Sequence, residues 1–217
     1  MISKKAILLI NVTGFLLLGA ISEGWLYSYD YEDSSPRIRQ LEIDNIALRE
    51  EIRRLRFLQD LSLEFSMSPR IVSLVDRYAR DYVNAEKMEW RLIQTPEFLT
   101  HIMLSLIHAE SRGESTAIGD SGRAVGLTQI WTSTAQQYGD VGPEDLLDPE
   151  TNIDYAFRHL HYLLKRYRGN LALALYAWNR GQGTVDRLIR HGESPDNGFA
   201  PRVYRAALSA SQESAGP

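Results

Sequence analysis

The amino-acid sequence predicts a mainly α-helical protein. Apolar side chains recur at spacings of three and four along much of the 217-residue chain, which is the period of one face of an α-helix. Two helix start signals, Ser68-Pro69 and Thr95-Pro96, place a capping residue directly before a proline. No run of alternating apolar and polar residues is long enough to predict a β-strand. Together these observations favour helices packed around a common core.

The composition is that of an ordinary globular protein. Hydrophobic residues make up 44% of the chain and charged residues 24%, so most of the chain can bury a core. The net charge of -4 argues against a nucleic-acid partner, because binding DNA or RNA needs Lys and Arg clustered on one face. The absence of cysteine excludes disulfides, thiolate metal sites and cysteine nucleophiles, but it leaves the cellular compartment open.

Residues 1–30 are predicted to be a signal anchor or a signal peptide. Lys4 and Lys5 precede a nearly unbroken apolar run over residues 6–21. As a helix this run rises about 24 Å, which is marginal for the ~30 Å hydrocarbon core of a bilayer. The small residues Ala20 and Ser22 offer a passable cleavage site, so both forms stay open. In either form the two lysines stay in the cytoplasm and the rest of the chain crosses the membrane.

Residues 36–66 are predicted to form a helical linker with a seam at heptad a and d positions. The seam consists of Ile38, Leu41, Asn45, Leu48, Ile52, Leu55 and Gln59. One interpretation is a short coiled coil that makes a parallel homodimer through residues 38–59, in which Asp44 pairs with Arg49 across the interface. The alternative is a single amphipathic helix on the domain that follows, since the seam runs for only about three heptads.

The rest of the chain is predicted to be a series of helices joined by Gly- and Pro-rich loops. Residues 68–94 form one helix that leads into a domain over residues 95–211. Inside this domain the first helix opens at Thr95. Further helical patterns cover residues 133–138, 152–167, 170–178, 183–191 and 201–211.

Glu110 is the strongest candidate for a functional side chain. In the helix that opens at Thr95, it continues an apolar face formed by Leu99, Met103, Leu106 and Ile107. Burial raises the pKa of a carboxyl group, which allows a glutamate to act as a general acid near neutral pH. The alternative is a glutamate at a helix end that turns to solvent, and spacing alone favours this alternative.

Two later segments supply further candidate residues. Residues 119–130 carry three glycines ahead of Gln129, whose amide can both donate to and accept from a sugar. Residues 171–183 form an apolar run that ends in Trp178, Asn179 and a glycine-permitted turn, a combination that suits a pyranose ring. Each segment also has a simpler explanation, a turn in which Gln129 caps a helix and a glycine cap beside a packed tryptophan.

Taken in order, these segments resemble the soluble lytic transglycosylase family, the relatives of goose-type lysozyme. The matching motifs are Glu110-Ser111, Gly126-Leu127-Thr128-Gln129-Ile130, Thr134-Ala135, Asn152-Ile153, His159-Leu160, Leu163-Leu164, Ala177-Trp178-Asn179-Arg180-Gly181 and Tyr204. The departures from the family pattern are Thr128 for Met, Trp178 and His159 for Tyr, Thr132 for Pro, and Ala200-Pro201 for a Glu-Thr pair. They leave Glu110 intact and concern the contacts to the sugar and to this acid.

The resemblance implies a lysozyme-like helical catalytic domain over residues 95–211 that acts on peptidoglycan. It implies cleavage of the β-1,4 bond between N-acetylmuramic acid and N-acetylglucosamine with formation of a 1,6-anhydromuramic acid product, without a cofactor or metal. Glu110 would be the catalytic acid/base, and the substrate-binding residues would be Ser111, Gly126, Gln129, Trp178, Asn179 and Tyr204. The implied location is the bacterial cell envelope, with the domain in the periplasm, either anchored to the inner membrane through residues 6–21 or secreted.

Two other functions stay open. A lysozyme-like muramidase would hydrolyse the bond, and most such enzymes need a second carboxylate about 5 to 9.5 Å from the first. The candidates are Asp120, Asp140 and Asp154, each of which reads as a surface charge. The other function is a non-catalytic glycan-binding membrane scaffold. A metal site is not expected, because the pair His159 and His161 points to different helix faces.

Overall fold

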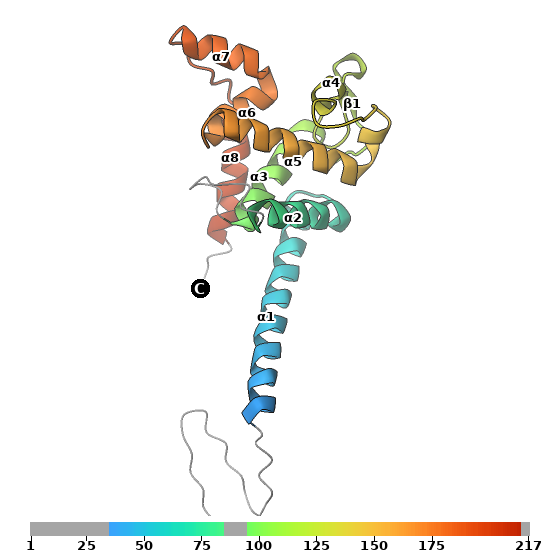
Figure 1. Ribbon diagram of the computed structural model, residues 1–217, viewed down its shortest axis with the longest axis vertical. Coiled ribbons are helices and arrows are strands. Elements are labelled where there is room, and N and C mark those ends of the chain that lie inside the picture. The colour runs from blue at the N-terminus through green and yellow to red at the C-terminus, as the bar shows by residue number, and fades with distance from the viewer. Residues whose placement is uncertain (1–34, 85–94, 214–217) are drawn as a thin grey trace, which may run out of the picture. The chain divides into compact units, whose positions relative to one another are not determined.

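A computed structural model describes residues 35–84 and 95–213 (Figure 1). The chain divides into two units, Met1–Ala47 and Leu48–Pro217. Of the first unit, the described part is the beginning of helix α1 (Ser35–Glu64). The predicted signal segment over residues 1–30 lies outside the described residues. In the described part of the chain, no helix combines the length and the apolar character that a membrane span needs.

The described residues are mainly helical, as the sequence predicts. After α1 the helices are α2 (Pro69–Asn84), α3 (Pro96–Ser111), α4 (Thr132–Ala135), α5 (Pro149–Arg166), α6 (Leu171–Arg180), α7 (Gln182–Arg190) and α8 (Phe199–Glu213). Two short 3-10 helices, η1 (Asp120–Gly122) and η2 (Asp145–Leu147), lie in the connections. The helix predicted over residues 68–94 is observed as α2 as far as Asn84, and its remaining residues lie outside the described ranges.

Side-chain caps fix where the main helices begin. The Thr95 hydroxyl accepts a hydrogen bond from the Phe98 N–H at 3.2 Å, and Pro96 occupies the first helical position of α3. In α5 the Asp148 carboxylate plays the same part, at 2.9 Å from the backbone N of the third helical residue. Each cap stabilises its helix by about 1 kcal/mol. The Thr95 cap is the one predicted from the sequence, whereas α5 begins at Pro149, three residues before its predicted start.

The mainly helical domain also contains a small sheet that the sequence did not predict. Strand β1 (Ile118–Gly119) pairs antiparallel with β2 (Ala124–Val125), which pairs antiparallel with β3 (Ile130–Trp131). Each strand is only two residues long, so no alternating pattern could develop in the sequence. The sheet folds the glycine-containing segment back on itself, with Trp131 directly opposite Ala124.

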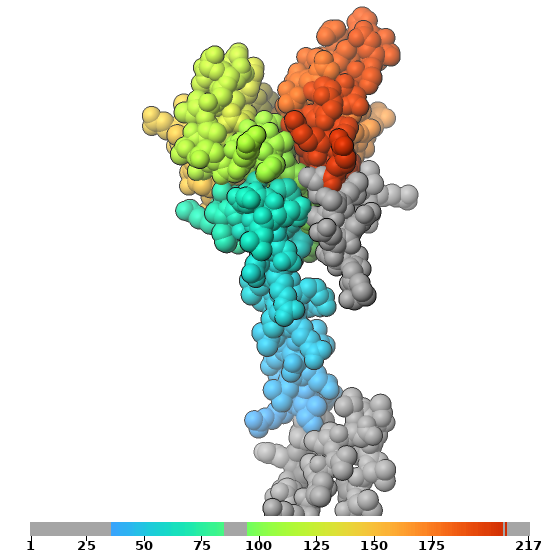
Figure 2. Space-filling view, turned by 180° about the vertical axis from the view of Figure 1, so that it is seen from behind, coloured from blue at the N-terminus to red at the C-terminus, as the bar shows by residue number. Residues whose placement is uncertain are grey.

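The core is built around α3. Its apolar face is fully buried, as the side chains of Leu99, Met103, Leu106 and Ile107 have no exposed surface. Helices α2 and α8 pack against α3, and in the space-filling view α2 (teal) adjoins the green segment that contains α3 (Figure 2). Helix α5 packs on α2 and α6, with the Phe157 ring 5.2 Å from the ring of Tyr82. The face that leads to Glu110 is therefore enclosed.

Helix α1 joins this core through a different face from the predicted seam. In its part from Leu48 onward, the seam residues Ile52 and Leu55 stay exposed, whereas Leu58 and Leu61 are buried in the core. On the same side as the buried pair, Arg54 forms an ion pair of 3.0 Å with the buried carboxylate of Asp76 in α2. In this part of α1, the residues that contact the domain therefore lie off the predicted seam.

Candidate active site

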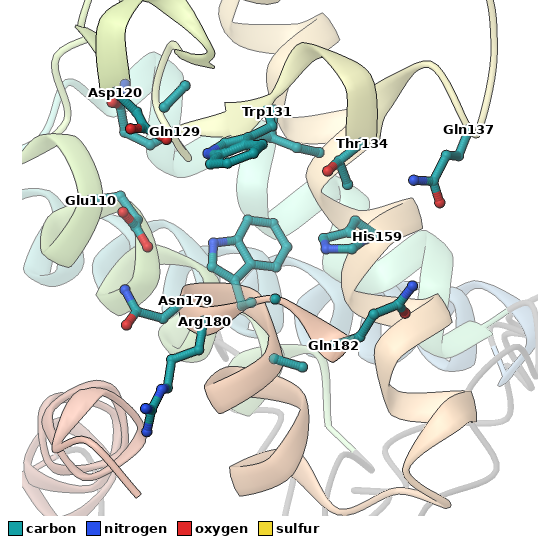
Figure 3. A pocket seen from close by; sticks show the side chains of 15 residues that line it. Glu110, Asp120, Gln129, Trp131, Thr134, Gln137, His159, Asn179, Arg180 and Gln182 are labelled. Atoms are coloured by element: carbon teal, nitrogen blue, oxygen red, sulfur yellow. The ribbon is translucent and has the colours of Figure 1, made fainter. Parts of the chain in front are cut away.

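A cleft of about 460 Å³ opens beside the end of α3 (Figure 3). One wall comes from the segment 120–137, which contains β2, β3 and α4, and the other from the junction of α6 and α7. In Figure 3, Gln129 and Trp131 lie on one side and Asn179 and Arg180 on the other, with Glu110 at one end. Segments far apart in the sequence therefore meet at this acid.

Glu110 projects into the cleft from the last turn of α3. Burial raises the pKa of its carboxyl group from 4.5 to about 7, while the positive charge of Arg202 and a hydrogen bond from Trp178 act in the opposite direction. A group with this pKa exists both as acid and as carboxylate near neutral pH. It can therefore donate a proton in one step and accept one in the next.

Ser111, the neighbour of Glu110, links the end of α3 to the wall formed by the segment 120–137. Its hydroxyl donates to the Leu127 carbonyl oxygen at 2.6 Å and accepts from the Gly113 N–H at 3.2 Å. The helix stops at the next residue, Arg112, whose φ of 56° is left-handed. Ser111 is not among the residues that line the cleft, and its bonds act on the position of Glu110.

Trp178 connects Glu110 to an aromatic cluster that includes His159 and Tyr138. The indole N–H is the only donor of this side chain, so it makes the hydrogen bond to the Glu110 carboxyl group. The indole packs against the ring of His159, with 5.0 Å between ring centroids, and His159 Nδ1 lies 2.9 Å from the Tyr138 hydroxyl oxygen. Burial lowers the pKa of His159 to about 4, so this ring is neutral at pH 7 and leaves the charge of the cleft to other groups.

Gln129 folds back on its own turn. Its amide nitrogen donates to the carbonyl oxygens of Ala117 at 3.0 Å and Gly126 at 2.9 Å. Both amide hydrogens are engaged in these bonds, so Gln129 cannot donate to a sugar without giving one of them up. A Cβ at Gly119 would lie 2.4 Å from Gln129 Oε1, so a larger residue there would displace this side chain. Gln129 lines the cleft and also holds its wall together.

Gly126 and Thr128 support this wall from behind the cleft. Gly126 has a φ of 74°, and a Cβ there would lie 2.3 Å from the Leu146 carbonyl oxygen. The Thr128 hydroxyl donates to Asn152 Oδ1 at 2.7 Å, and both side chains are fully buried. Neither Gly126 nor Thr128 lines the cleft, so the departure at Thr128 does not touch the surface available to a sugar.

Of the two remaining candidate residues, one lines the cleft and the other does not. Asn179 lines the cleft, where its Oδ1 accepts a hydrogen bond of 2.7 Å from Asn197. Tyr204 does not line the cleft and packs against the core from α8. From the first turn of the same helix, Arg202 places the positive charge that acts on Glu110.

Asp120, which the sequence analysis interprets as a surface charge, lies in the lining of the cleft. It lines the cleft with Glu110 and forms an ion pair of 2.7 Å with Arg123. Among the described residues it is the second carboxylate of this lining. Asp154 is paired with Arg158 at 2.7 Å, and neither it nor Asp140 lines the cleft.

Sequence patterns did not single out Trp131 or His159 as site residues. Trp131 follows directly after the Gln129-Ile130 motif, and His159 is a departure from the family pattern at a motif position, so both positions carried a signal. Their place in the cleft depends on the folding of the small sheet and on the packing of α5 against α6, which local sequence does not display.

Comparison with known proteins agrees on the type of domain. Residues 91–197 match the sequence model of the family described as the transglycosylase SLT domain, and this range contains all the residues that line the cleft. The bifunctional muramidase/DL-endopeptidase CwlT of Bacillus subtilis (strain 168) is 28% identical over 92 residues, which are 42% of this chain and 24% of that protein.

A solved structure also resembles this chain. It is an inactive mutant of the lytic transglycosylase Slt from Pseudomonas aeruginosa, with a TM-score of 0.47 and 21% sequence identity, and the similarity covers 52% of this chain and 22% of that one. The matched region spans less than a quarter of the length of each of these two proteins.

Proposed function

Because this chain carries a transglycosylase SLT domain over residues 91–197, we propose that it is a peptidoglycan lytic transglycosylase. The bond cleaved is the β-1,4 bond between N-acetylmuramic acid and N-acetylglucosamine. The observation that carries the proposal is the state of Glu110, a partly buried acid with a pKa of about 7 that faces a cleft lined by aromatic and amide groups. A glycan strand offers the hydroxyl and acetamido groups that such a lining recognises.

Glu110 performs both proton transfers in this mechanism. As an acid it protonates the glycosidic oxygen of the leaving N-acetylglucosamine, and the bond to C1 of N-acetylmuramic acid breaks. As a carboxylate it then takes the proton of the 6-hydroxyl, whose oxygen bonds to C1 and closes the 1,6-anhydro ring. The proton that left the enzyme is thereby returned, and no water is consumed. A pKa near the working pH serves both steps.

Trp178 supports the second half of this cycle. Its indole N–H donates to the Glu110 carboxyl group, and a donor stabilises the carboxylate that remains after the first proton transfer. The neutral His159 ring packs against the indole, so the donor is held without a competing positive charge beside it. In this arrangement Trp178 is a positioning residue for the acid.

Purified peptidoglycan provides the direct test. The parent protein is expected to release fragments that end in 1,6-anhydromuramic acid, identified by mass spectrometry, and Glu110→Gln is expected to release none while keeping the parent circular dichroism spectrum. Release at the parent rate by Glu110→Gln would refute the assignment. A parent protein that binds the walls and releases nothing would instead support a non-catalytic scaffold.

A second candidate function, a muramidase that hydrolyses the same bond, is favoured by one observation. Asp120 lines the cleft with Glu110, and a hydrolase of the common type needs two carboxylates. The products separate the two functions, because a hydrolytic product is heavier by one water and has a reducing end. Asp120→Asn gives an independent answer in kcat, since a hydrolase that uses Asp120 as its second carboxylate loses turnover, whereas the proposed lytic transglycosylase keeps its kcat.

We further propose that the domain works in the bacterial cell envelope, held at the inner membrane through residues 6–21 with its cleft in the periplasm. The support is the apolar run itself and the two lysines before it, Lys4 and Lys5. An anchored chain requires detergent for extraction from membranes. A chain that is recovered without detergent and lacks its first residues by mass spectrometry would show cleavage of a signal peptide.

A parallel homodimer through residues 38–59 is also proposed. The support is that Leu48, Ile52 and Leu55 stay exposed along the heptad seam, where a second copy would cover them. Light scattering on the chain that begins at residue 36 is expected to give a dimer, and Ile52→Asp is expected to give a monomer. A monomer before the substitution would refute this proposal without affecting the chemistry of Glu110.

A further inference from the structure

Trp131 is an exposed aromatic side chain inside the cleft. It keeps 42% of its surface exposed, although it stands at the end of β3 in a well-packed part of the domain. Other exposed apolar side chains, such as Ile118 and Ile189, do not line the cleft. A large apolar surface left open in a concave site marks a place where a ligand supplies the missing contact.

The ring of Trp131 is held in place from one side. The Arg123 guanidinium carbon lies 4.5 Å from the ring centroid, which is the geometry of a cation–π contact. Arg123 is itself fixed by Asp120, because its Nη2 donates to Oδ1 at 2.7 Å and its Nε donates to the backbone oxygen at 3.1 Å. The pairing of β2 with β3 sets the backbone of Trp131. The indole therefore enters a complex with little freedom left to lose.

The open face of the ring is turned toward the cleft. Arg123 is not among the residues that line the cleft, so the face it covers is the one turned away from the ligand space. Figure 3 shows Trp131 between Gln129 and Thr134, on the wall opposite Asn179. A flat apolar surface thus faces a wall of hydrogen-bonding side chains across the space that a glycan would occupy.

A pyranose ring in a β-1,4-linked strand has matching surfaces. Its axial C–H groups form a flat apolar face, and its hydroxyl and acetamido groups lie around the edge. The apolar face fits an aromatic ring, while the edge groups fit amide and hydroxyl side chains such as Asn179 and Thr134. A charged or elongated apolar ligand would satisfy only one of these two surfaces.

We propose that Trp131, backed by Arg123, is a stacking platform for one pyranose ring of the glycan strand and sets how tightly the strand is held in the cleft. The inference rests on the proposed function for the class of ligand, since the strand is the substrate named there. It assigns Trp131 to substrate binding and leaves proton transfer to Glu110. Its loss is therefore expected in affinity and in KM, with kcat largely kept.

The test measures binding with a protein that does not cut. In Glu110→Gln, isothermal titration calorimetry with the β-1,4-linked hexamer of N-acetylglucosamine gives the reference Kd. Adding Trp131→Ala is expected to weaken binding about tenfold, which corresponds to about 1.4 kcal/mol. Trp131→Phe keeps a smaller ring and is expected to lose less, and Arg123→Gln, which frees the indole, is expected to weaken binding by about threefold.

Ile189→Ala is the matched control, because Ile189 is an exposed apolar side chain outside the cleft. It is expected to leave the Kd unchanged. Binding by Trp131→Ala within about twofold of the reference would overturn the inference, as would a reference protein that does not bind the hexamer. Loss of the proposed function has a separate signature, wall cleavage that survives Glu110→Gln, and that result does not alter the comparison between the Trp131 variants.

Discussion

Replacing Glu110 by Gln should stabilise the folded protein at alkaline pH. In the unfolded chain this carboxyl group ionises near 4.5, and burial raises its pKa to about 7 in the folded state. Between these two values the folded protein binds more protons than the unfolded chain does, so the free energy of unfolding falls as the pH rises. Glutamine keeps the shape of the side chain but cannot ionise. The variant therefore does not lose stability as the pH rises through the pKa of Glu110.

The two pKa values set the size of the effect. A difference of about 2.5 pH units, at 1.36 kcal/mol for each, gives an upper limit of about 3.4 kcal/mol above pH 7. Glu110 is only partly buried, and solvent screening lowers the figure to about 2 kcal/mol. At pH 4, where both states carry a largely protonated carboxyl group, the difference should nearly vanish.

Urea unfolding followed by circular dichroism measures this difference directly. The midpoint of Glu110→Gln is expected above that of the parent at pH 8, with little difference at pH 4. Glu144→Gln is the matched control, because the same chemical change at an exposed glutamate should alter stability little at either pH. If Glu110→Gln is no more stable than the parent at pH 8, the carboxyl group is not held in the raised-pKa state on which the mechanism depends.

Three further predictions concern Trp178 and two residues behind the cleft wall, Gly126 and Asn152. Trp178→Phe removes a hydrogen bond that lowers the pKa of Glu110. In the pH profile of wall-cleaving activity, the fall on the alkaline side should therefore move up by about one pH unit. An unchanged pH profile would contradict this role of Trp178. Gly126→Ala brings a Cβ within 2.3 Å of a backbone oxygen at a φ of +74° and should lower the free energy of unfolding by at least about 2 kcal/mol. Gly122→Ala, with nothing within 4 Å, should lose only about 1 kcal/mol, and equal losses in urea unfolding would count against the close approach. Asn152→Ala leaves buried backbone groups without partners and should lower the unfolding free energy by about 3 kcal/mol, whereas a loss below about 1 kcal/mol would mean that its hydrogen bonds contribute little.

Helix positions were largely readable from the sequence because the signals that set them are local. The cap at Thr95 and the proline after it act within four residues, and the apolar face of α3 repeats within one turn. The two-residue strands around Gly119 and Trp131 could not be read, since their pairing depends on segments that meet only in the folded chain. The sequence showed that the seam of α1 is apolar, but the spacing of the seam residues did not determine which residues they contact.

The residues of the candidate site were also predicted only in part. The motif order brought Glu110, Gln129, Trp178 and Asn179 forward as candidates, and the structure places all four along one cleft. It places Tyr204 in the packing around the core instead, because a motif position specifies a residue type and not the direction of its side chain.

The sequence by itself determined the helical class and the starts of α2 and α3, and it singled out Glu110 as the candidate acid, because each depends on residues close together in the chain. Only the tertiary structure decided the pKa of Glu110, since that value depends on burial and on groups as distant in the chain as Trp178 and Arg202. It likewise decided that Trp131 faces the cleft with Arg123 behind it, because the folding of a short sheet selects which face of an aromatic ring meets the ligand space.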